Sequence, residues 1–330
     1  MRAAVITSPG GPEVFAIQTL DDPRIGPEEV LVEVYATALN RADLMQRRGR
    51  YPSPQGVRDD LPGLEMAGVV IETGERVAAW KPGDRVMALL GGGGYGSRVA
   101  VHERMLMSIP PNLSFEQAAS IPEVFLTAFD ALFLQCGLQP GETALVHAAG
   151  SGVGTAAIQM ASVVGCRVFG TAGSDEKLGD AVALGLNVGI NYHTENFAET
   201  VAARTDGRGV DVILDVIGAD YWARNLEALA MRGRMVLVGT MSGAKVDADL
   251  GRVMSKRLRV HGTMLRSRPL EEKATLTQEF ARRMLPLFAS ERLVAVVDRV
   301  YPLEEVAEAH RYMESNANFG KIVLRHGGDG

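Results

Sequence analysis

The sequence predicts an α/β protein in which a doubly wound parallel sheet is inserted within a mostly β domain. Residues 1–110 form short apolar runs punctuated by Gly and Pro, whereas residues 143–238 alternate such runs with helical segments. The tail returns to mixed structure. Alternating strands and helices need crossover connections, which build a parallel sheet with helices on both faces. A length of 330 residues fits two domains.

The first part of the chain contains strands and then one helical region. Runs of Val, Ile, Leu, Tyr and Thr predict strands at 3–7, 15–20, 30–39, 68–72, 85–90 and 106–109. The composition of Lys81-Pro82-Gly83-Asp84 predicts a turn. Helical periodicity begins after Ser114 and continues, with an interruption near Pro122, to residue 134.

The rest of the chain supplies the alternating elements and the tail. Strands are predicted at 144–147, 167–171, 189–192, 211–216 and 235–238, with helices at 155–164 and 177–184. The tail predicts an amphipathic helix at 275–288, a strand at 294–301, a helix at 303–315 and a strand at 321–324. The predicted domains are therefore 1–124 and 266–330 together, with 125–265 inserted between them.

Composition argues against several classes of protein. The chain is 46% hydrophobic with a net charge of −6, and its densest basic stretch, Lys256 to Arg259, predicts a solvated turn rather than a nucleic-acid surface. Cys136 and Cys166 match no zinc spacing and predict buried thiols in a reducing compartment. No apolar run approaches the roughly 20 residues of a membrane helix. We expect a cytoplasmic protein.

A glycine-rich turn after the strand at 144–147 predicts a dinucleotide site. Small residues at the start of a helix let a pyrophosphate approach the backbone at the positive helix end. A strict GxGxxG ending at Gly154 would place glycines at 149 and 151, where this chain has alanine and serine. An ordinary strand–helix turn is the alternative. The residues expected to contact the cofactor are Ala149, Gly150, Ser151, Gly152 and Val153.

The end of the next strand favours NADPH over NADH. A basic residue there welcomes the 2′-phosphate, whereas an acidic one binds the ribose hydroxyl of NAD. Asp175 and Glu176 leave NAD open, but they follow the strand end, on the turn into the helix. The residues expected to hold the phosphorylated ribose are Gly173, Ser174, Lys177 and Tyr192.

Several segments in a fixed order carry a family resemblance. They are Asn40-Arg41-Ala42-Asp43, Arg48 to Pro52, Pro62 to Gly68, Trp80 to Val86, Ala149 to Gly154, Asp220-Tyr221-Trp222, Leu265 to Arg268 and Asn318 to Val323. Over nearly its whole length, the chain resembles the zinc-free quinone oxidoreductase branch of the medium-chain dehydrogenase/reductase superfamily, especially the tumour-suppressor-inducible members. The resemblance implies a Rossmann domain inserted in a GroES-like catalytic domain, and a homodimer.

The resemblance also implies chemistry without a metal. Zinc-containing relatives carry a cysteine near the position of Asn40 and a histidine near Leu64, and a four-cysteine loop where this chain has Gly91 to Gly96. An alcohol dehydrogenase needs a Lewis acid to stabilise an alkoxide. A quinone is already electrophilic, so it needs only a hydride, stacking on the nicotinamide and hydrogen bonds to its oxygen.

The same resemblance suggests site residues, each with an ordinary alternative. Asn40 and Tyr51 are expected to line the substrate pocket and Ser151 to affect the cofactor or substrate access, yet they could be a helix cap, a loop aromatic and a turn residue. Arg266 could equally be an interdomain salt bridge, and His147 the end of a buried strand. The remaining residues expected to bind the cofactor are Ile217, Gly239, Thr240, Met241, Leu265, Arg266, Ser267, Asn316 and Lys321.

These expectations favour an NADPH:quinone oxidoreductase working in an interdomain cleft, with ortho-quinones among the candidate substrates. The alternative enzyme is a 2-enoyl thioester or enone reductase, because sister branches use the same scaffold with a proton-donating tyrosine. An alternative of another class is a structural, crystallin-like protein or a binder of AU-rich RNA. The acidic balance and the lack of a basic stripe argue against RNA.

Overall fold

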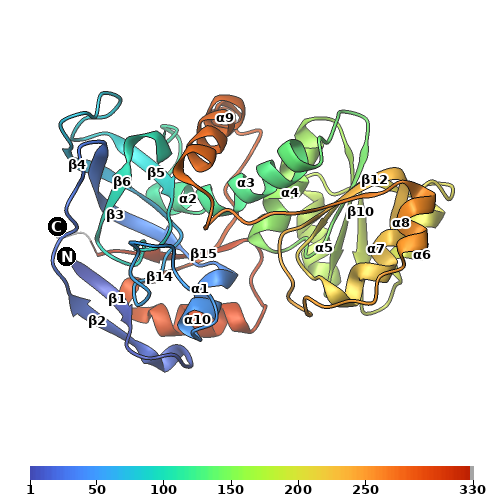
Figure 1. Cartoon of the computed structure of the whole chain (residues 1–330), viewed down its shortest axis with the longest axis horizontal. Coiled ribbons are helices and arrows are strands. Elements are labelled where there is room, and N and C mark those ends of the chain that lie inside the picture. Colours follow the sequence, from blue (N-terminus) through green and yellow to red (C-terminus); the bar gives the residue numbers. More distant parts are fainter. Residues whose placement is uncertain (328–330) are drawn as a thin grey trace. The chain divides into compact units, whose positions relative to one another are not determined.

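A computed structural model describes residues 1–327 and divides the chain into two compact units (Figure 1). The split unit consists of residues 1–126 and 265–330, and the inserted unit of residues 127–264. The boundaries lie at 126/127 and 264/265, where the sequence placed them at 124/125 and 265/266. One domain is thus interrupted by the other, and the chain returns to the first to complete it.

A seven-stranded sheet forms the frame of the split unit. Its strand order is β14-β15-β3-β4-β5-β7, with β6 also paired to β3, and every pair is antiparallel except β14 with β15. Two further strands pair as a hairpin, β1 with β2. The strands are β1 (Arg2–Ile6), β2 (Phe15–Thr19), β3 (Glu29–Ala38), β4 (Glu65–Thr73), β5 (Arg85–Leu89), β6 (Arg98–His102), β7 (Leu106–Ser108), β14 (Val297–Pro302) and β15 (Lys321–Arg325).

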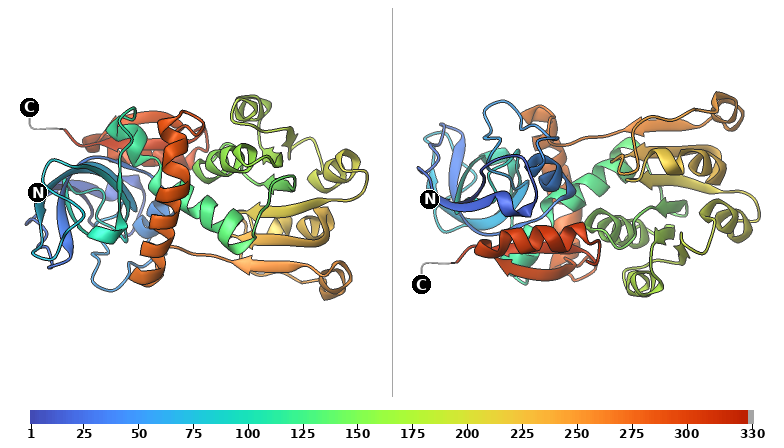
Figure 2. Two further views of the ribbon diagram at one scale, coloured as in Figure 1. Left: turned by 90° about the horizontal axis from the view of Figure 1, so that it is seen from above. Right: turned by 90° about the horizontal axis from the view of Figure 1, so that it is seen from below.

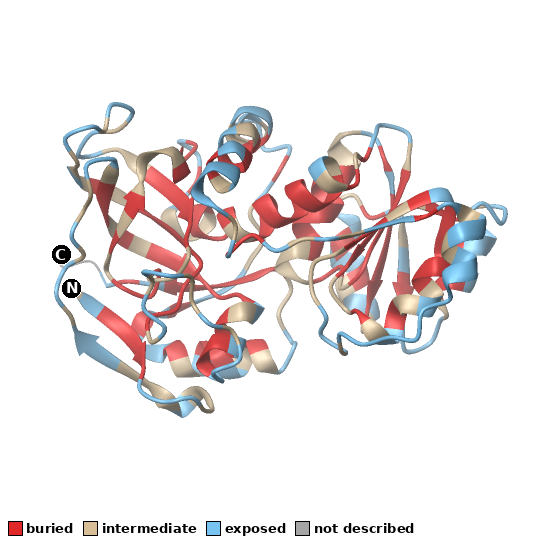
Figure 3. Ribbon diagram, viewed as in Figure 1, coloured by how far each residue is buried: buried red, intermediate tan, exposed pale blue. Residues whose placement is uncertain are grey.

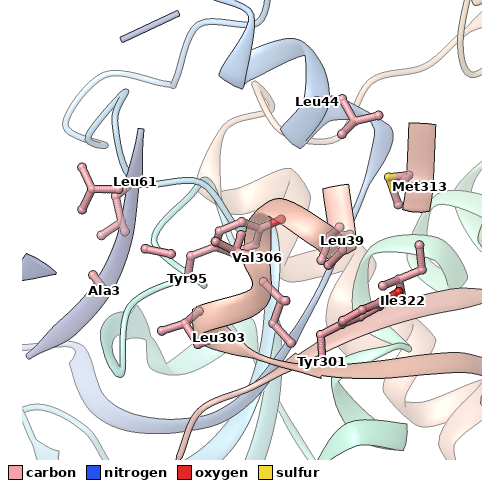
Figure 4. Packing of buried hydrophobic residues seen from close by; sticks show 14 residues of the cluster. Ala3, Leu39, Leu44, Leu61, Tyr95, Tyr301, Leu303, Val306, Met313 and Ile322 are labelled. Atoms are coloured by element: carbon pink, nitrogen blue, oxygen red, sulfur yellow. The ribbon is translucent and has the colours of Figure 1, made fainter. Parts of the chain in front are cut away.

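Helices and a hydrophobic core complete the split unit. The helices are α1 (Arg41–Arg47), α2 (Phe115–Ala119), α3 (Pro122–Phe129), α9 (Leu270–Ala289) and α10 (Val306–Glu314); α3 crosses the boundary between the units. One buried cluster joins α10 and β15 to the N-terminal strand and to α1 (Figure 4). Tyr95 lies in this cluster and is fully buried. Segments from both ends of the chain therefore share one core, so the C-terminal segment is part of the same folding unit.

The inserted unit is a six-stranded parallel sheet with helices on both sides (Figure 2). The strand order β10-β9-β8-β11-β12-β13 reverses direction between β8 and β11. This is the doubly wound order in which a dinucleotide binds where the strand order reverses. The strands are β8 (Thr143–Val146), β9 (Arg167–Ala172), β10 (Val188–Asn191), β11 (Val210–Asp215), β12 (Leu229–Leu237) and β13 (Arg259–Gly262).

The helices of the inserted unit are α4 (Gly152–Val163), α5 (Asp175–Val182), α6 (Phe197–Arg204), α7 (Trp222–Ala228) and α8 (Leu250–Lys256). Strand β8 is buried along its whole length, as expected for a strand covered on both faces (Figure 3). A second hydrophobic cluster fills one face of this sheet and includes Leu145, Phe169 and Phe197. The predicted fold class, a Rossmann sheet inserted within a mostly β, GroES-like domain, is confirmed.

The interpretation of Lys256 to Arg259 as a solvated turn is wrong at both ends. Lys256 ends α8, and its ammonium group donates to the carbonyl oxygens of Leu226, Glu227 and Leu229 at 2.6–3.1 Å, near the end of α7. Arg257 alone adopts the left-handed conformation of a helix C-cap, and Arg259 begins β13. A basic residue can satisfy the last carbonyl groups of a neighbouring helix, which no local sequence pattern reveals.

Among the described residues, no helix combines the length and apolar character that crossing a membrane would require.

Candidate active site

The turn between β8 and α4 has the geometry of an anion-binding helix start. Ser151 is the N-cap of α4, and its Oγ accepts a hydrogen bond from the N–H of Gly154 at 3.0 Å. The N–H groups of Gly152 and Val153 begin the helix and therefore have no acceptor within it. They lie at the positive end of a twelve-residue helix, where a pyrophosphate would be stabilised.

Gly154 lets the helix approach the turn more closely than any other residue could. A Cβ at this position would lie 2.2 Å from the carbonyl oxygen of Ala148. Ala148 itself has a φ of 54°, so the turn is held in a conformation that L residues rarely adopt. Ala149 is fully buried and its N–H donates to the carbonyl of Thr171, so its main-chain donor serves the turn.

The residues predicted to bind the phosphorylated ribose lie together at the end of β9. Ser174 caps α5 by accepting from the N–H of Lys177 at 3.3 Å. The hydroxyl of Tyr192 lies beside Gly173, since a Cβ on that glycine would be 2.5 Å from it. Asp175, which left NAD open, accepts from the side-chain amide of Asn191 at 2.8 Å.

The ends of β11 and β12 bring the other predicted main-chain contacts of the inserted unit side by side. The N–H groups of Met241 and Ser242 donate to the carbonyls of Val216 and Ile217. Asp215 is fully buried, and its carboxylate accepts from the N–H of Ile217 at 2.6 Å. Gly239 and Thr240 lie in the same loop pair at the carboxyl end of the sheet. The residues of the inserted unit thus fit a dinucleotide at the place where strand order reverses.

His147 is fully buried at the end of β8 and has a structural role. Its Nε2 donates to Oδ1 of Asn225 at 2.7 Å, and its Nδ1 accepts from the hydroxyl of Thr171 at 3.0 Å. Burial lowers the pKa of His147 to about 4. The hydrogen bond to Asn225 acts in the opposite direction, but its effect on the pKa is smaller. The ring is therefore neutral at neutral pH.

The split unit contains a buried polar cluster formed by Asn40, Glu65 and Lys321. The Nζ of Lys321 donates to Leu39 O and Asn40 Oδ1 at 2.7 Å and lies 2.8 Å from Oε1 of Glu65. The amide of Asn40 donates to Ala38 O at 3.2 Å and to Glu65 Oε1 at 2.9 Å. Every hydrogen-bond donor of the Asn40 and Lys321 side chains is thus engaged in the cluster.

Asn40 occupies the N-cap position of α1, as its alternative interpretation expected, and forms a capping box with Asp43. The N–H of Asn40 donates to Oδ2 of Asp43 at 2.8 Å, so the carboxylate of Asp43 supplies the local hydrogen bond. Asp43 is fully buried, and burial raises its pKa to about 6. The helix start is therefore fixed by Asp43, while Asn40 holds the polar cluster.

Arg266 holds the loop that carries Tyr51. Its guanidinium carbon lies 4.9 Å from the centre of the Tyr51 ring. Its N–H groups donate to Gly91 O and Gln46 Oε1 at 2.8 Å, to Ser53 Oγ at 3.0 Å, and at 3.4 Å to the carbonyls of Tyr51 and Pro52. None of these acceptors is a carboxylate, so the salt bridge considered for Arg266 is not seen among the described residues.

The other predicted residues of the split unit are spread over its surface and interior. Leu265 is buried, Ser267 is exposed, and Asn316 is exposed with a φ of 57° and accepts from the guanidinium group of Arg41. Lys321, expected to reach a cofactor, is 4% exposed and engaged with Glu65.

Two functional candidates were missed at the sequence level, Glu65 as part of the cluster and Glu123 beside it. The sequence does not single out Glu65, because a carboxylate in a strand gives no sign of its partners. Its Oε2 accepts from the N–H of Glu123 in the first turn of α3 at 2.8 Å. Burial, and next the charge of Glu65, raise the pKa of Glu123 to about 7. Pro122 directly before Glu123 was a signal for a helix start with an acidic first turn.

The residues around Asn40 do not fit a zinc ion. Asn40 and Leu64 replace the expected thiolate and imidazole, and the ammonium group of Lys321 lies against the Asn40 oxygen. A cation at this point repels a second one. Within residues 1–327, no group of three His, Cys, Asp or Glu side chains is arranged to hold a metal ion.

Comparison with known proteins agrees with this architecture. Residues 26–111 match the model for the alcohol dehydrogenase GroES-like domain, and residues 152–288 match that for zinc-binding dehydrogenases. The quinone oxidoreductase of Lama guanicoe is 33% identical over 98% of this chain and 97% of its own length. The human synaptic vesicle membrane protein VAT-1 homolog is 32% identical over 98% of this chain and 86% of its own.

Solved structures show the same fold. A protein described as an NAD-dependent alcohol dehydrogenase has a TM-score of 0.89 at 36% identity, covering 99% of this chain and 100% of the other. The CurK enoyl reductase has a TM-score of 0.87 at 30% identity, with 99% of each chain covered. A mycobacterial protein complexed with NADPH has a TM-score of 0.88 at 28% identity, covering 98% and 100%.

The inserted dinucleotide fold and the split β domain define an oxidoreductase of the nicotinamide-dependent class. The chain belongs to the medium-chain dehydrogenase/reductase superfamily, among relatives of the quinone oxidoreductase type.

Proposed function

We propose that this chain reduces quinones with NADPH. The polar cluster of Asn40, Glu65 and Lys321 carries the proposal, because it puts an amide and an ammonium group where the resemblance expects a zinc ligand in metal-dependent relatives. Without a metal to polarise an alcohol oxygen, the acceptor has to be electrophilic by itself, and quinones are. The name of the Lama guanicoe relative supports the same substrate class.

The cofactor proposal rests on the end of β9. When bound, the nicotinamide supplies the hydride. Ser174 and Tyr192 offer a hydroxyl and a phenol near Gly173, and Lys177 in the first turn of α5 carries an ammonium group, a set suited to a 2′-phosphate. Asp175, the acid that would suit NAD, is bound to Asn191. The relative solved with NADPH supports this choice, although the relative described as NAD-dependent shows that the fold accepts both.

Steady-state kinetics test the proposal. NADPH oxidation is followed with an ortho-quinone and, separately, with a crotonyl thioester, and each reaction is repeated with NADH. We expect kcat/KM to favour the quinone and NADPH. A thioester preferred by more than about tenfold, or about 1.4 kcal/mol in transition-state binding, overturns the choice of quinone.

The thioester or enone is the second candidate because a specific observation favours it. Glu65 binds both the amide of Asn40 and the main-chain N–H of Glu123, so a second carboxyl group is held next to the polar cluster, and reduction of an enone also needs a proton donor. The CurK enoyl reductase shares the fold.

An RNA-binding role is tested by filter binding, where tight, salt-sensitive retention of RNA would support it.

A further inference from the structure

Hydride transfer to a quinone or an enone leaves a negative oxygen that needs a proton. The site residues suggested by the sequence include four apparent donors on the split unit: Asn40 and Tyr51, expected in the substrate pocket, and Arg266 and Lys321, expected to bind the cofactor. Their hydrogen bonds decide which of them has a proton to give. The inference that follows rests on the proposed function.

Three of these donors are fully engaged. Both N–H groups of the Asn40 amide and all three of the Lys321 ammonium group are used within their own cluster. The guanidinium group of Arg266 has acceptors for each of its nitrogens. For any of them to serve a substrate, a buried hydrogen bond would have to break, which costs on the order of 1–3 kcal/mol.

Two protonatable groups are left, the phenol of Tyr51 and the carboxyl of Glu123. Within residues 1–327, neither the phenol oxygen nor the carboxyl oxygens form a hydrogen bond or an ion pair, and both residues keep partial exposure. Their positions are nevertheless fixed. Arg266 lies over the Tyr51 ring, and Glu65 holds the main-chain N–H of Glu123.

The surroundings of Glu123 suit a proton donor at neutral pH. The charged groups that act on it come from every neighbouring element: Glu65 on β4 and Asp43 on α1 favour its protonated form, whereas Lys321 on β15 and Arg266 oppose it. Burial has the largest effect and raises the pKa of Glu123 to about 7. Tyr51 has a pKa raised above 10 by burial and by the Glu123 charge, so it is a much weaker acid.

We propose that Glu123 is the acid that protonates the reduced substrate, held next to Asn40 through Glu65, and that the Tyr51 phenol donates a hydrogen bond to the same oxygen. The acceptor gains two electrons and a hydrogen as hydride and is left as an oxyanion. The O–H bond of the Glu123 carboxyl breaks as the O–H bond of the product forms, and Glu123 remains as a carboxylate. Its partial exposure lets water return a proton before the next turnover. The site therefore takes acceptors whose reduction generates an oxyanion, namely quinones and enones.

The kinetic test compares Glu123→Gln with Tyr51→Phe over about pH 5.5 to 9. For the wild type, we expect kcat/KM to fall as pH rises through about 7, because the acid is lost. Glu123→Gln is expected to lose this break and about a hundredfold in kcat, with NADPH affinity unchanged. Tyr51→Phe should keep the break. A Glu123→Gln variant that retains both the break and a rate within threefold overturns the inference.

A second measurement does not depend on turnover. The infrared band of protonated carboxyl groups is titrated in the wild type and in Glu123→Gln, and the difference isolates Glu123 from Asp43, which titrates near pH 6. We expect the difference band to disappear as the pH rises through about 7. If the band is already absent at pH 6, the inference about Glu123 is overturned, whereas the proposed function is not. A wild type that reduces neither quinones nor enones overturns the proposed function and, with it, this inference, even where the band is present.

Discussion

At the scale of single residues, the number of hydrogen bonds separates groups that hold the site from groups that can act in it. The sequence suggests Asn40 for the substrate pocket and Lys321 and Arg266 for cofactor binding, yet all their donors are used. Buried polar groups must be paired, because an unpaired one costs more than a pair gains. We therefore assign these three residues to positioning, and leave Tyr51 and Glu123 as the chemically available groups.

Lys321→Met tests the positioning cluster. The change leaves Glu65, which is fully buried, without its cation, so we expect a loss of about 3–5 kcal/mol in the free energy of unfolding measured with urea. The exposed Lys81→Met serves as control and should change stability by less than about 0.5 kcal/mol. In the double variant Glu65→Gln/Lys321→Met the loss should be smaller than the sum of the singles. Strict additivity would show that the two groups do not interact.

Lys177→Ala tests the cofactor choice. Removing the ammonium group from the end of β9 should weaken NADPH binding about tenfold, about 1.4 kcal/mol, because a charge-assisted contact to the 2′-phosphate is lost. NADH, which lacks that phosphate, should bind with little change. Fluorescence titration of both dinucleotides measures the ratio. Equal losses would mean that the phosphate is held elsewhere.

His147 makes stability depend on acid. Its folded pKa of about 4 lies below the value of about 6.5 in an unfolded chain, so the unfolded state binds more protons between these values. The free energy of unfolding should therefore fall by up to about 3 kcal/mol as pH drops from 6.5 towards 4. Asp43 and Glu123, with raised pKa values, act in the opposite sense, so only a comparison of variants isolates the histidine.

The comparison uses His147→Gln, which keeps a donor towards Asn225, and the exposed His193→Gln as control. Urea unfolding at pH 4.5 and pH 7 should show a shallower pH dependence for His147→Gln than for the wild type and the control. Identical slopes for all three proteins would contradict a neutral, buried ring.

At the scale of elements, α4 and α5 show that glycine can have opposite effects on stability in two helices of the same unit. Gly154 in α4 allows a close approach to the turn, whereas Gly179 in α5 is exposed and a Cβ there would meet nothing within 4 Å. The first glycine is needed for geometry, and the second only lowers helix propensity.

Gly154→Ala and Gly179→Ala form a matched pair. The added methyl at 154 would meet the Ala148 oxygen at 2.2 Å, so we expect a loss of more than about 1 kcal/mol and weaker NADPH binding. At 179 the same change should stabilise the chain by about 0.5–1 kcal/mol. Thermal unfolding and dinucleotide titration provide both readings, and a Gly154→Ala variant that binds NADPH normally would refute the role of this approach.

At the scale of the whole molecule, the sheet of the inserted unit ends in an open edge. Strand β13 is paired on one side only, and within the inserted unit Val260 and Met264 are 37% and 56% exposed along or next to it. An apolar, unpaired edge is a surface that another strand can extend. We propose that two copies of the chain pair through β13 as a homodimer.

Light scattering tests this association. We expect twice the chain mass of 35.4 kDa, and a shift towards the monomer for Val260→Lys, which places a charge on the edge. Val246→Lys, at 40% exposure outside any strand, is the matched control and should remain dimeric. A wild type that is monomeric at micromolar concentration would end the proposal.

Prediction from the sequence succeeded where patterns are local. Strands such as β3 and β8 and the helix α9 were found from runs and periodicity, although α9 begins at Leu270, before the predicted residue 275. Helices α6, α7 and α8 and strands β6 and β13 were missed. Their apolar faces are short, and tertiary contacts, such as Lys256 bound to the end of α7, stabilise what local propensity does not.

The sequence alone determined the fold class and the place of the glycine-rich turn, because these depend on periodicity and on glycine positions that neighbouring residues define. The superfamily followed from the resemblance of several segments in a fixed order. The tertiary structure alone decided which polar side chains have all their hydrogen-bond donors engaged and which do not. The partners of Asn40 come from β4 and β15, more than 20 and 280 residues away. A hydrogen bond between such distant residues depends on how the chain packs, so no local pattern could assign Glu65 and Lys321 to one cluster or join Glu123 to it through Glu65.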